Sequence, residues 1–310
     1  MSALETTPCL VCGSTLNQPY YQLHDWACEL PGEFYLVTCS NCGHIFQDPR
    51  PAQADIGQYY PATYQPFWRS IDAETSAVKR RLRHWQWRPR CLQLARLLSG
   101  GKLLDVGSGT GLFLNEMRRY GMWRLAGVEL SPPAADYARR TFDLEIYAGQ
   151  VEDAPWPPAF FDAVTLWDVL EHLPNPRAAL SRIHTLLAQD GYLLFSVPNA
   201  SSIDARLFGR YWIGLDAPRH MSVFTLRALR RLLGETGFRI EAAYCFYGRY
   251  TTFALSTQQW LRAHRPPSAS RRRLERVLFF PGWRFLTLPY FYLIDQWRLG
   301  AILTIRARPK

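Results

Sequence analysis

The chain has 310 residues, of which 48% are hydrophobic and 20% are charged. This composition excludes a disordered or fibrous protein and predicts a soluble globular chain with one large core and room for a small accessory unit. Basic residues outnumber acidic ones by 36 to 26, with clusters at 79–83 and 271–273, which favours an anionic partner or solvated helix faces. The first residues lack a basic segment followed by an apolar run, so we expect a cytoplasmic protein.

Four cysteines near the start of the chain have the spacing of a metal site. They form two Cys-x-x-Cys pairs, each followed by glycine and separated by 26 residues. This pattern is typical of a tetrahedral zinc site, and a redox dithiol is the alternative. A zinc ribbon is therefore predicted for residues 1–48, which are too few to fold around an apolar core without metal. Because four thiolates leave no open coordination position, we expect a structural zinc held by Cys9, Cys12, Cys39 and Cys42.

The next segment has no regular periodicity at first. Residues 49–74 are rich in proline and tyrosine and are predicted to form an ordered linker or lid. Residues 73–98 then show a helical pattern with a basic start and an interruption near Pro89. Basic and aromatic residues are interleaved across 79–90, an arrangement that can also track phosphates and stack nucleic-acid bases.

Strands and helices alternate from residue 100 onward. The predicted strands lie at 102–107, 125–130, 144–149, 160–167, 191–199 and 239–246. Thr225 is expected to cap the helix over 226–237. This alternation is typical of an α/β protein with a parallel sheet that is covered by helices on both faces.

A glycine-rich turn directly follows the first of these strands. Gly107, Gly109 and Gly111 alternate with other residues, which matches neither a phosphate-binding P-loop nor the dinucleotide-binding pattern. Glycine lets a ligand approach the backbone closely, and Asp105 just before the turn can bind an ammonium group. Glu129, which ends the next strand, can accept both hydroxyls of a ribose. An amino acid joined to a ribose describes S-adenosylmethionine.

These segments resemble the class I S-adenosylmethionine-dependent methyltransferases over roughly residues 75–247. Residues 103–111 are similar to their first motif, 128–130 to their second, and 160–176 to their fourth strand and its exit. The resemblance implies a doubly wound, Rossmann-like sheet of seven mostly parallel strands, in which 301–309 is antiparallel and lies between the fifth and sixth. It also implies a cofactor site formed by Asp105, Gly107, Ser108, Gly109, Gly111, Glu129, Leu130, Gln150, Val151 and Trp167. Gln150 stands where many relatives carry aspartate, and its carbonyl can accept the same hydrogen bond from adenine.

Residues 167–172 resemble the corresponding segment of the ubiquinone-pathway O-methyltransferases. On that resemblance Asp168, Glu171 and His172 can hold magnesium, because their spacing places them on one face if the segment is helical. The alternative is that Glu171 and His172 cap or orient the loop after the strand. A hydroxyl acceptor also requires a base, and the expected catalytic residues are His172, His220 and Asp168.

A long excursion at about 248–297 separates the last two strands. Its apolar and aromatic part at 277–294 contains Pro281, Gly282, Arg284 and Pro289, so it does not predict a membrane span. Because three arginines precede it, residues 271–294 can lie in a membrane interface, which would place the protein at the inner membrane face. The other interpretation is two short helices packed on the catalytic domain or at a dimer interface.

Together these features predict a zinc ribbon at 1–48, a linker or lid at 49–74 and a methyltransferase domain at 75–310. The combination resembles bacterial enzymes that methylate sugars or secondary metabolites. We therefore expect methyl transfer from S-adenosylmethionine to a hydroxyl of a sugar, a lipid-linked glycan or a secondary metabolite. One alternative is an RNA methyltransferase that uses the ribbon and the basic clusters. Another is a cofactor-binding interaction protein without catalysis, and the oligomeric state is left open.

Overall fold

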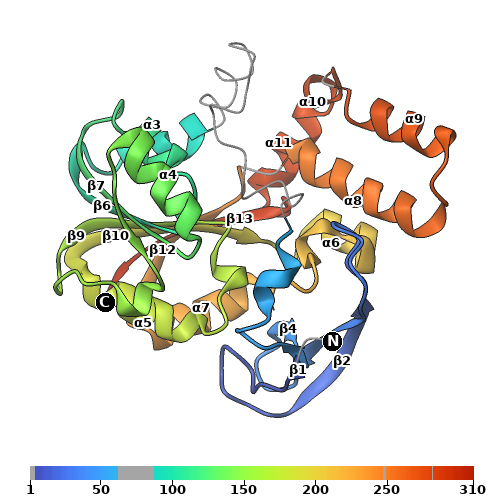
Figure 1. Ribbon diagram of the computed structural model, residues 1–310, viewed down its shortest axis with the longest axis horizontal. Coiled ribbons are helices and arrows are strands. Elements are labelled where there is room, and N and C mark those ends of the chain that lie inside the picture. Colours follow the sequence, from blue (N-terminus) through green and yellow to red (C-terminus); the bar gives the residue numbers. More distant parts are fainter. Residues whose placement is uncertain (1–3, 62–86, 247–248, 281) are drawn as a thin grey trace.

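A computed structural model describes residues 4–61, 87–246, 249–280 and 282–310 (Figure 1). Its centre is a seven-stranded sheet in the order β12-β13-β10-β9-β6-β7-β8. The strands β6 to β10 pair in parallel, whereas β13 is antiparallel to both of its neighbours. The predicted sheet of seven mostly parallel strands is confirmed, including the place of the last strand. The strands are β6 Gly100–Val106, β7 Met122–Glu129, β8 Glu145–Ala148, β9 Phe161–Trp167, β10 Leu187–Pro198, β12 Phe238–Tyr244 and β13 Ile302–Pro309.

Helices cover both faces of this sheet. Figure 1 shows α3 (Leu112–Met117) and α4 (Pro132–Phe142) on one side, and α5 (Pro176–Leu186) and α7 (Leu226–Glu235) on the other. The Thr225 hydroxyl accepts a hydrogen bond from the Ala228 backbone N–H, as the sequence predicts for the start of α7. The sheet is therefore doubly wound, and its carboxyl edge is free for a site.

Apolar residues of the strands alternate between the two faces. Leu103 packs in a core cluster with residues of α3 and α4, whereas its neighbour Leu104 packs in a cluster with residues of α5 and α7. Successive side chains of a strand point to opposite faces, so a continuous apolar strand is buried on both sides.

The N-terminal part forms a small sheet of its own. Its order is β11-β4-β3-β2, and a separate pair joins β1 to β5. β11 comes from far along the chain, just before α7, and it pairs with β4. The N-terminal sheet is thus completed by two residues that lie between β10 and β12 of the large sheet along the chain. The elements are β1 Leu4–Glu5, β2 Asn17–Leu23, β3 Phe34–Cys39, β4 Ile45–Gln47, β5 Arg50–Pro51, the 3-10 turn η1 Ile56–Tyr59 and β11 Ser222–Val223.

The described residues of the excursion before β13 form four helices, which project from the body of the molecule (Figure 1). They are α8 Arg249–His264, α9 Ala269–Leu278, α10 Gly282–Leu286 and α11 Leu288–Gln296. Two residues of α8 and two of α11 form a small core of their own, consisting of Tyr250, Ala254, Phe291 and Ile294. On its other side α8 packs against α6 (Ile203–Phe208) and the 3-10 turns η5 (Gly209–Tyr211) and η6 (Ile213–Leu215). The two short helices expected on the catalytic domain or at a dimer interface correspond to α10 and α11, and both pack on α8.

Three further expectations concern segments that lie partly or wholly outside the described residues. The basic cluster at 79–83 lies wholly outside them, as do residues 62–74 of the predicted linker or lid. Of the helix predicted at 73–98, residues 87–98 are described, and the helix ends at residue 95. Pro89 lies within this helical stretch, so the chain is not interrupted there. Among the described helices, none combines the length and the apolar character needed to cross a membrane.

Candidate functional site

The glycine turn lies between β6 and α3, at the carboxyl edge of the sheet. Gly107, Gly109 and Gly111 have φ angles of 73°, 54° and 77°, which side-chain-bearing residues rarely adopt. A side chain at Gly107 would collide with Val169, and one at Gly111 would collide with Leu144. A Cβ atom added at Gly109 would have no described atom within 4 Å, apart from those of Gly109 and its two chain neighbours. Gly109 therefore presents open backbone where a ligand is expected to approach.

Asp105 is buried at the end of β6. Its carboxylate accepts a hydrogen bond of 2.7 Å from the Thr165 hydroxyl on the neighbouring strand β9. Burial raises the pKa of Asp105 to about 7, although Thr165 and the charge of Arg90 oppose this shift. A cationic ligand group would stabilise the charged form, so the carboxylate is suited to bind an ammonium group.

Glu129 is buried at the end of β7, beside the glycine turn. One carboxylate oxygen accepts a hydrogen bond of 2.7 Å from Gly109 N, and the other accepts one of 2.8 Å from Ser131 N. Burial raises the pKa of Glu129, and these backbone N–H groups oppose the shift. Each oxygen has more than one lone pair, so the oriented carboxylate can still accept two hydroxyl groups.

The other expected cofactor residues line the same edge. Leu130 is exposed next to Glu129, and Val151 is buried after β8. The buried Ser108 hydroxyl has no hydrogen-bond partner among the described residues. The side-chain carbonyl of Gln150 accepts a hydrogen bond of 3.2 Å from Gln53. The segment after the cysteines therefore reaches the position where adenine is expected.

A buried arginine lies beside the end of β9. The guanidinium carbon of Arg90 lies 4.8 Å from the ring centroid of Trp87 and 5.2 Å from that of Trp167. Arg90 also donates to one carboxylate oxygen of Asp168 at 2.5 Å, while the Ser196 hydroxyl donates to the other at 2.7 Å. Both oxygens of the predicted catalytic Asp168 are thus engaged. Arg90 was not predicted as a site residue, because nothing in the basic run at 79–90 indicates that its last arginine is buried.

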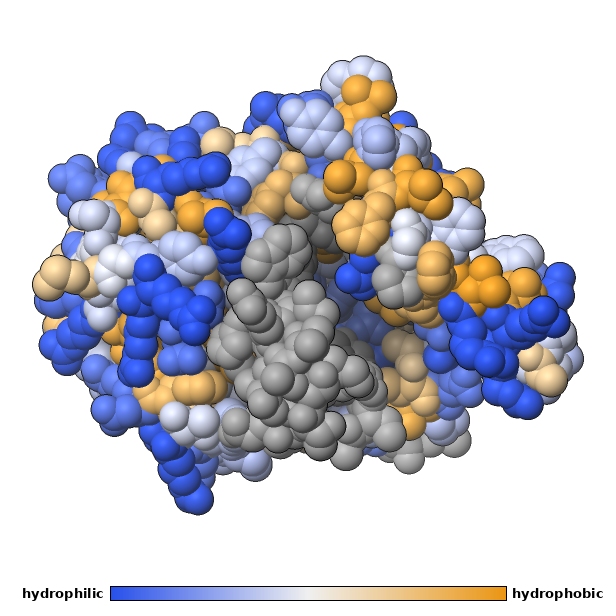
Figure 2. All heavy atoms as spheres, turned by 90° about the horizontal axis from the view of Figure 1, so that it is seen from above, coloured by the Kyte–Doolittle hydropathy of each residue, from blue (hydrophilic) through white to orange (hydrophobic). Residues whose placement is uncertain are grey.

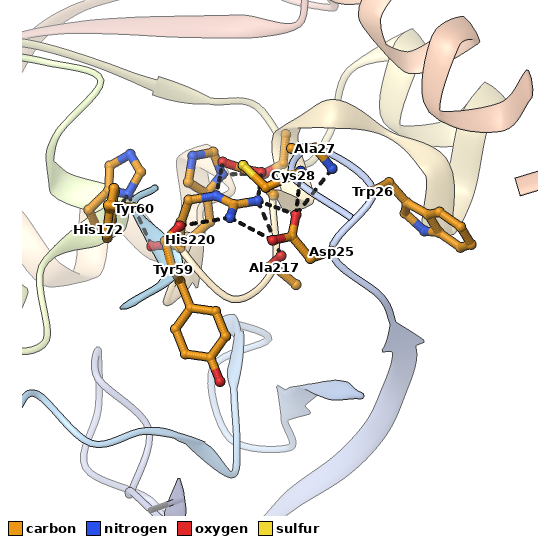
Figure 3. A network of polar contacts seen from close by, with 12 residues as sticks. Asp25, Trp26, Ala27, Cys28, Tyr59, Tyr60, His172, Ala217 and His220 are labelled. Carbon is orange, nitrogen blue, oxygen red and sulfur yellow. Dashed lines mark hydrogen bonds and ion pairs between the residues drawn. The ribbon is translucent and has the colours of Figure 1, made fainter. Parts of the chain in front are cut away.

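The two predicted catalytic histidines lie side by side (Figure 3). Their ring centroids are 4.6 Å apart, with the rings nearly perpendicular. His172 ends the 3-10 turn η4 (Leu170–His172) after β9, and His220 lies in the loop before β11. Residues 48 positions apart along the chain therefore meet at the edge where the acceptor is expected.

Backbone carbonyls determine which nitrogen of each ring carries the hydrogen. His172 Nδ1 lies 3.0 Å from the Arg219 carbonyl oxygen, and His220 Nδ1 lies 2.9 Å from that of Gly214. A carbonyl only accepts, so both Nδ1 atoms donate and both Nε2 atoms keep a lone pair. Burial lowers the pKa of His172 to about 3 and also lowers the pKa of His220. Both rings are therefore neutral near pH 7, and each Nε2 can accept a proton.

The predicted magnesium site is not supported by this geometry. Asp168 has a φ of 58° and precedes η4, so the segment is not one helix with Asp168, Glu171 and His172 on the same face. The groups that do lie within 4.8 Å of one another are Glu171, His172 and His220. Magnesium prefers a set of oxygen ligands, whereas this set contains two imidazole nitrogens. Burial and the neighbouring Asp168 raise the pKa of Glu171, which favours its protonated form.

Buried Arg219 joins the N-terminal part of the chain to the histidine loop. Its side chain is 0% exposed and donates to both oxygens of Asp25, at 2.8 and 2.6 Å. It also donates to both oxygens of Asp216 and to the Tyr59 carbonyl oxygen. Since the Arg219 carbonyl accepts the hydrogen of His172 Nδ1, this network holds the histidine pair from the N-terminal side.

Tyr60 reaches the same histidine from the N-terminal part. Figure 3 shows Tyr60 beside His172, and its hydroxyl oxygen lies 3.1 Å from His172 Nδ1. Neither Tyr60 nor Asp25 was predicted as a site residue. No motif distinguishes them, because their contacts join residues 112 and 194 positions apart.

The four cysteines expected to bind zinc converge beside β3 and β4. The Sγ atoms of Cys9 and Cys42 are 3.5 Å apart, as are those of Cys12 and Cys39, and all four lie within 4.8 Å of one another. Four thiolates at about 2.3 Å from a tetrahedral zinc have sulfurs about 3.8 Å apart, so this cluster fits that ion. A disulfide would require about 2.05 Å, so the cysteines are free thiols.

Residues 76–243, which are more than half of the chain, match the model of a family described as a methyltransferase domain. The chain is 33% identical over 109 residues to the ubiquinone biosynthesis O-methyltransferase of Neisseria meningitidis serogroup C, which covers 33% of this chain and 46% of that protein. It is 31% identical over 136 residues to the malonyl-(acyl-carrier protein) O-methyltransferase of Serratia marcescens, which covers 44% and 52% respectively. The chain thus spans about half the length of the curated relatives it matches.

Two solved structures are similar over most of their length. A protein of Pyrococcus horikoshii OT3 has a TM-score of 0.51 at 16% identity, over 82% of this chain and 99% of that one. The cyclase SpnF has a TM-score of 0.51 at 18% identity, over 84% and 97%. At these identities the similarity shows the fold alone, and since SpnF is described as a cyclase, the fold does not by itself determine the reaction.

Proposed function

The chain belongs to the methyltransferase domain family, and from this we infer that it transfers a methyl group from S-adenosylmethionine to a hydroxyl oxygen of a small molecule. One observation carries the proposal. An open glycine turn, two buried carboxylates and two neutral histidines converge on the same edge of the sheet. The glycine turn and the two carboxylates suit the methyl donor, and the histidines suit an acceptor that must lose a proton.

The cofactor half of the site follows from the two carboxylates. When bound, S-adenosylmethionine supplies a methyl group on a positively charged sulfur, which is a good leaving group. Asp105 binds the ammonium group, and Glu129, held by Gly109 N and Ser131 N, accepts the ribose hydroxyls. Gly109 lets the ligand approach the backbone, while Leu130, Gln150 and Val151 surround the base. Trp167 forms one wall and packs edge-on against Phe113, with their ring centroids 5.6 Å apart.

The acceptor half lies at the exit of β9. Alignment of the acceptor oxygen with the methyl carbon and the sulfur provides much of the acceleration in such a displacement. His172 or His220 removes the hydroxyl proton through Nε2, because both Nδ1 atoms are occupied by backbone carbonyls. Asp168 acts as a positioning residue rather than a base, since Arg90 and Ser196 engage both of its oxygens.

The two curated relatives support oxygen as the acceptor atom, because both are named O-methyltransferases. The acceptor is a small molecule such as a sugar, a lipid-linked glycan or a secondary metabolite. RNA is less favoured as the acceptor. Arg90, the last residue of the basic run, is buried between two tryptophans and paired with Asp168, so it is not placed to bind phosphates.

The test combines product identification with two histidine variants. The purified protein is incubated with radiolabelled methyl donor and fractionated pools of sugars, lipid-linked glycans, secondary metabolites and RNA. Once an acceptor is identified, we expect His172→Ala or His220→Ala to lower kcat by about 10²–10⁴-fold, the usual contribution of a general base. Cofactor affinity measured by calorimetry should stay within about twofold, because neither ring belongs to the proposed cofactor half.

His264→Ala is the matched control, because His264 is exposed on α8, where its Nδ1 lies 2.8 Å from the Trp260 carbonyl oxygen and its ring contacts Trp260 and Tyr211. This control should retain full turnover. Wild-type kcat in both site variants would remove the proposed base. A product methylated on RNA would instead establish the alternative acceptor.

A further inference from the structure

The helices α9, α10 and α11, together with the residues that directly follow α9 and α11, expose several large apolar side chains. These include Phe279, Phe280, Trp283, Phe285, Leu286 and Trp297, and we call this the α9–α11 surface. Phe285 and Leu286 are 78% and 72% exposed. Figure 2 shows hydrophobic residues gathered over this side of the molecule, with hydrophilic residues beside them. Apolar surface gathered in this way marks an interaction site.

The short helices α9 and α10 bury no residue within the described part of the protein. α9 has 10 residues and α10 has 5. Isolated helices shorter than about 12–15 residues are only marginally stable in water, and helices in proteins gain most of their stability by burying an apolar face. α11 buries Phe291 and Ile294 against α8, but its exposed face still carries Tyr290, Tyr292 and Leu293. The surface is therefore incomplete as it stands.

The charges on this part of the chain indicate what covers it. Residues 249–298 contain nine arginines and only two acidic residues, Glu275 and Asp295. Asp295 is buried, and Glu275 lies 3.6 Å from Arg271. Arg272, Arg273, Arg276 and Arg284 are exposed, and none of them forms an ion pair with a described residue. The charge that the surface offers to a partner is thus positive.

We propose that the α9–α11 surface docks the protein on an anionic membrane surface. A lipid bilayer matches both properties at once, because apolar side chains enter the boundary of the acyl chains while arginines bind lipid phosphates. Tryptophan and tyrosine suit this depth, since one end of each ring system is apolar and the other is polar. A second copy of the chain would bring two arginine-rich surfaces together, and their repulsion disfavours that occupant. The proposal goes beyond the methyl transfer proposed above and does not depend on it.

Vesicle flotation of the full-length protein tests the proposal. Vesicles of phosphatidylcholine with 30 mol% phosphatidylglycerol are compared with vesicles of phosphatidylcholine alone, at low salt and at 0.5 M salt. We expect binding to the anionic vesicles that is weakened by salt, and much weaker binding to the neutral ones. Both F285S/L286S and R272E/R273E should lower the partition coefficient by about tenfold or more.

Matched controls lie on the catalytic body of the protein. Met122→Ser removes an apolar side chain that is 90% exposed, and Arg140→Glu reverses an exposed charge on α4. Both should bind vesicles like the wild type, and circular dichroism and cofactor affinity check the folding of every variant.

Equal binding to neutral and anionic vesicles, or wild-type binding by both double variants, would overturn the proposal. A concentration-dependent dimer that F285S/L286S abolishes, without vesicle binding by the wild type, would show instead that the surface joins two copies. Because flotation needs neither donor nor acceptor, failure here leaves the proposed reaction untouched.

Discussion

At the scale of single residues, burial determines the protonation states on which the proposed chemistry depends. It raises the pKa of Asp105 to about 7 and lowers that of His172 to about 3. In each case desolvation disfavours the charged form, so the acid keeps its proton longer and the imidazole loses it sooner. The two halves of the site should therefore respond differently to pH.

Cofactor affinity should weaken as the pH falls through 7. An ammonium group binds the carboxylate form of Asp105, and in the ligand-free protein this form is lost below the raised pKa of about 7. Calorimetry between pH 5.5 and 7.5 should show a decrease approaching tenfold per pH unit at the acid end. Asp105→Asn should bind weakly and lose this pH dependence. A flat wild-type profile would contradict the assignment of Asp105.

At the scale of elements, the contact between the N-terminal part and the histidine loop depends on one buried ion-pair network. The side chains of Arg219 and Asp25 are both 0% exposed, so each charge is stabilised by the other rather than by water. The surface pair of Arg262 and Glu29 joins the same N-terminal segment to α8 at 3.8 Å, with Glu29 59% exposed. These two ion pairs allow a direct comparison of buried and exposed interactions.

Asp25→Ala should lower the free energy of unfolding by about 3–5 kcal/mol, because it leaves Arg219 buried with half of its carboxylate partners removed. Glu29→Ala, the control, should cost less than about 1 kcal/mol. Urea unfolding followed by circular dichroism measures both values. In the folded Asp25→Ala variant, kcat should fall more than cofactor affinity, since the network supports His172 rather than Asp105. Equal losses of unfolding free energy in the two variants would show that the buried ion pair contributes no more to stability than the exposed one.

The sequence predicted those elements whose signal is local. Cys39 and Cys42 lie three positions apart, and Asp105 lies two residues before Gly107, so spacing alone predicted the roles proposed for them. Arg90, Asp25 and Tyr60 act through contacts between distant parts of the chain, which leave no periodic or spaced pattern. The predicted magnesium set has no support from the structure, because it assumed a helix through Asp168, where the backbone instead has a φ of 58°.

At the scale of the whole molecule, the expected zinc connects the N-terminal sheet to the proposed active site. Val11 and the buried cysteines Cys9, Cys39 and Cys42 belong to the same apolar cluster as residues of α5 and α7. Loss of the metal would release this cluster and, through the Arg219 network, loosen the histidine loop.

We expect one zinc per chain, and we expect chelation to lower the unfolding midpoint by about 5 °C or more. Cys39→Ser should lose the metal, whereas Cys28→Ser should retain it, because Cys28 lies outside the four-cysteine cluster. Metal content and thermal unfolding are measured on the same samples. Full zinc content in Cys39→Ser, or an unchanged midpoint after chelation, would exclude a structural zinc at this cluster.

The pairing of β11 with β4 has a consequence for how this protein can be divided. Ser222 and Val223 of β11 pair with Phe46 and Ile45 of β4, so two residues from the methyltransferase domain form the outer strand of the N-terminal sheet. A ribbon produced separately would present a bare strand edge, which invites pairing with other molecules. If the N-terminal part is transferred to another protein, a new strand has to pair with β4 in place of β11. If it is removed instead, β11 needs a new partner in place of β4.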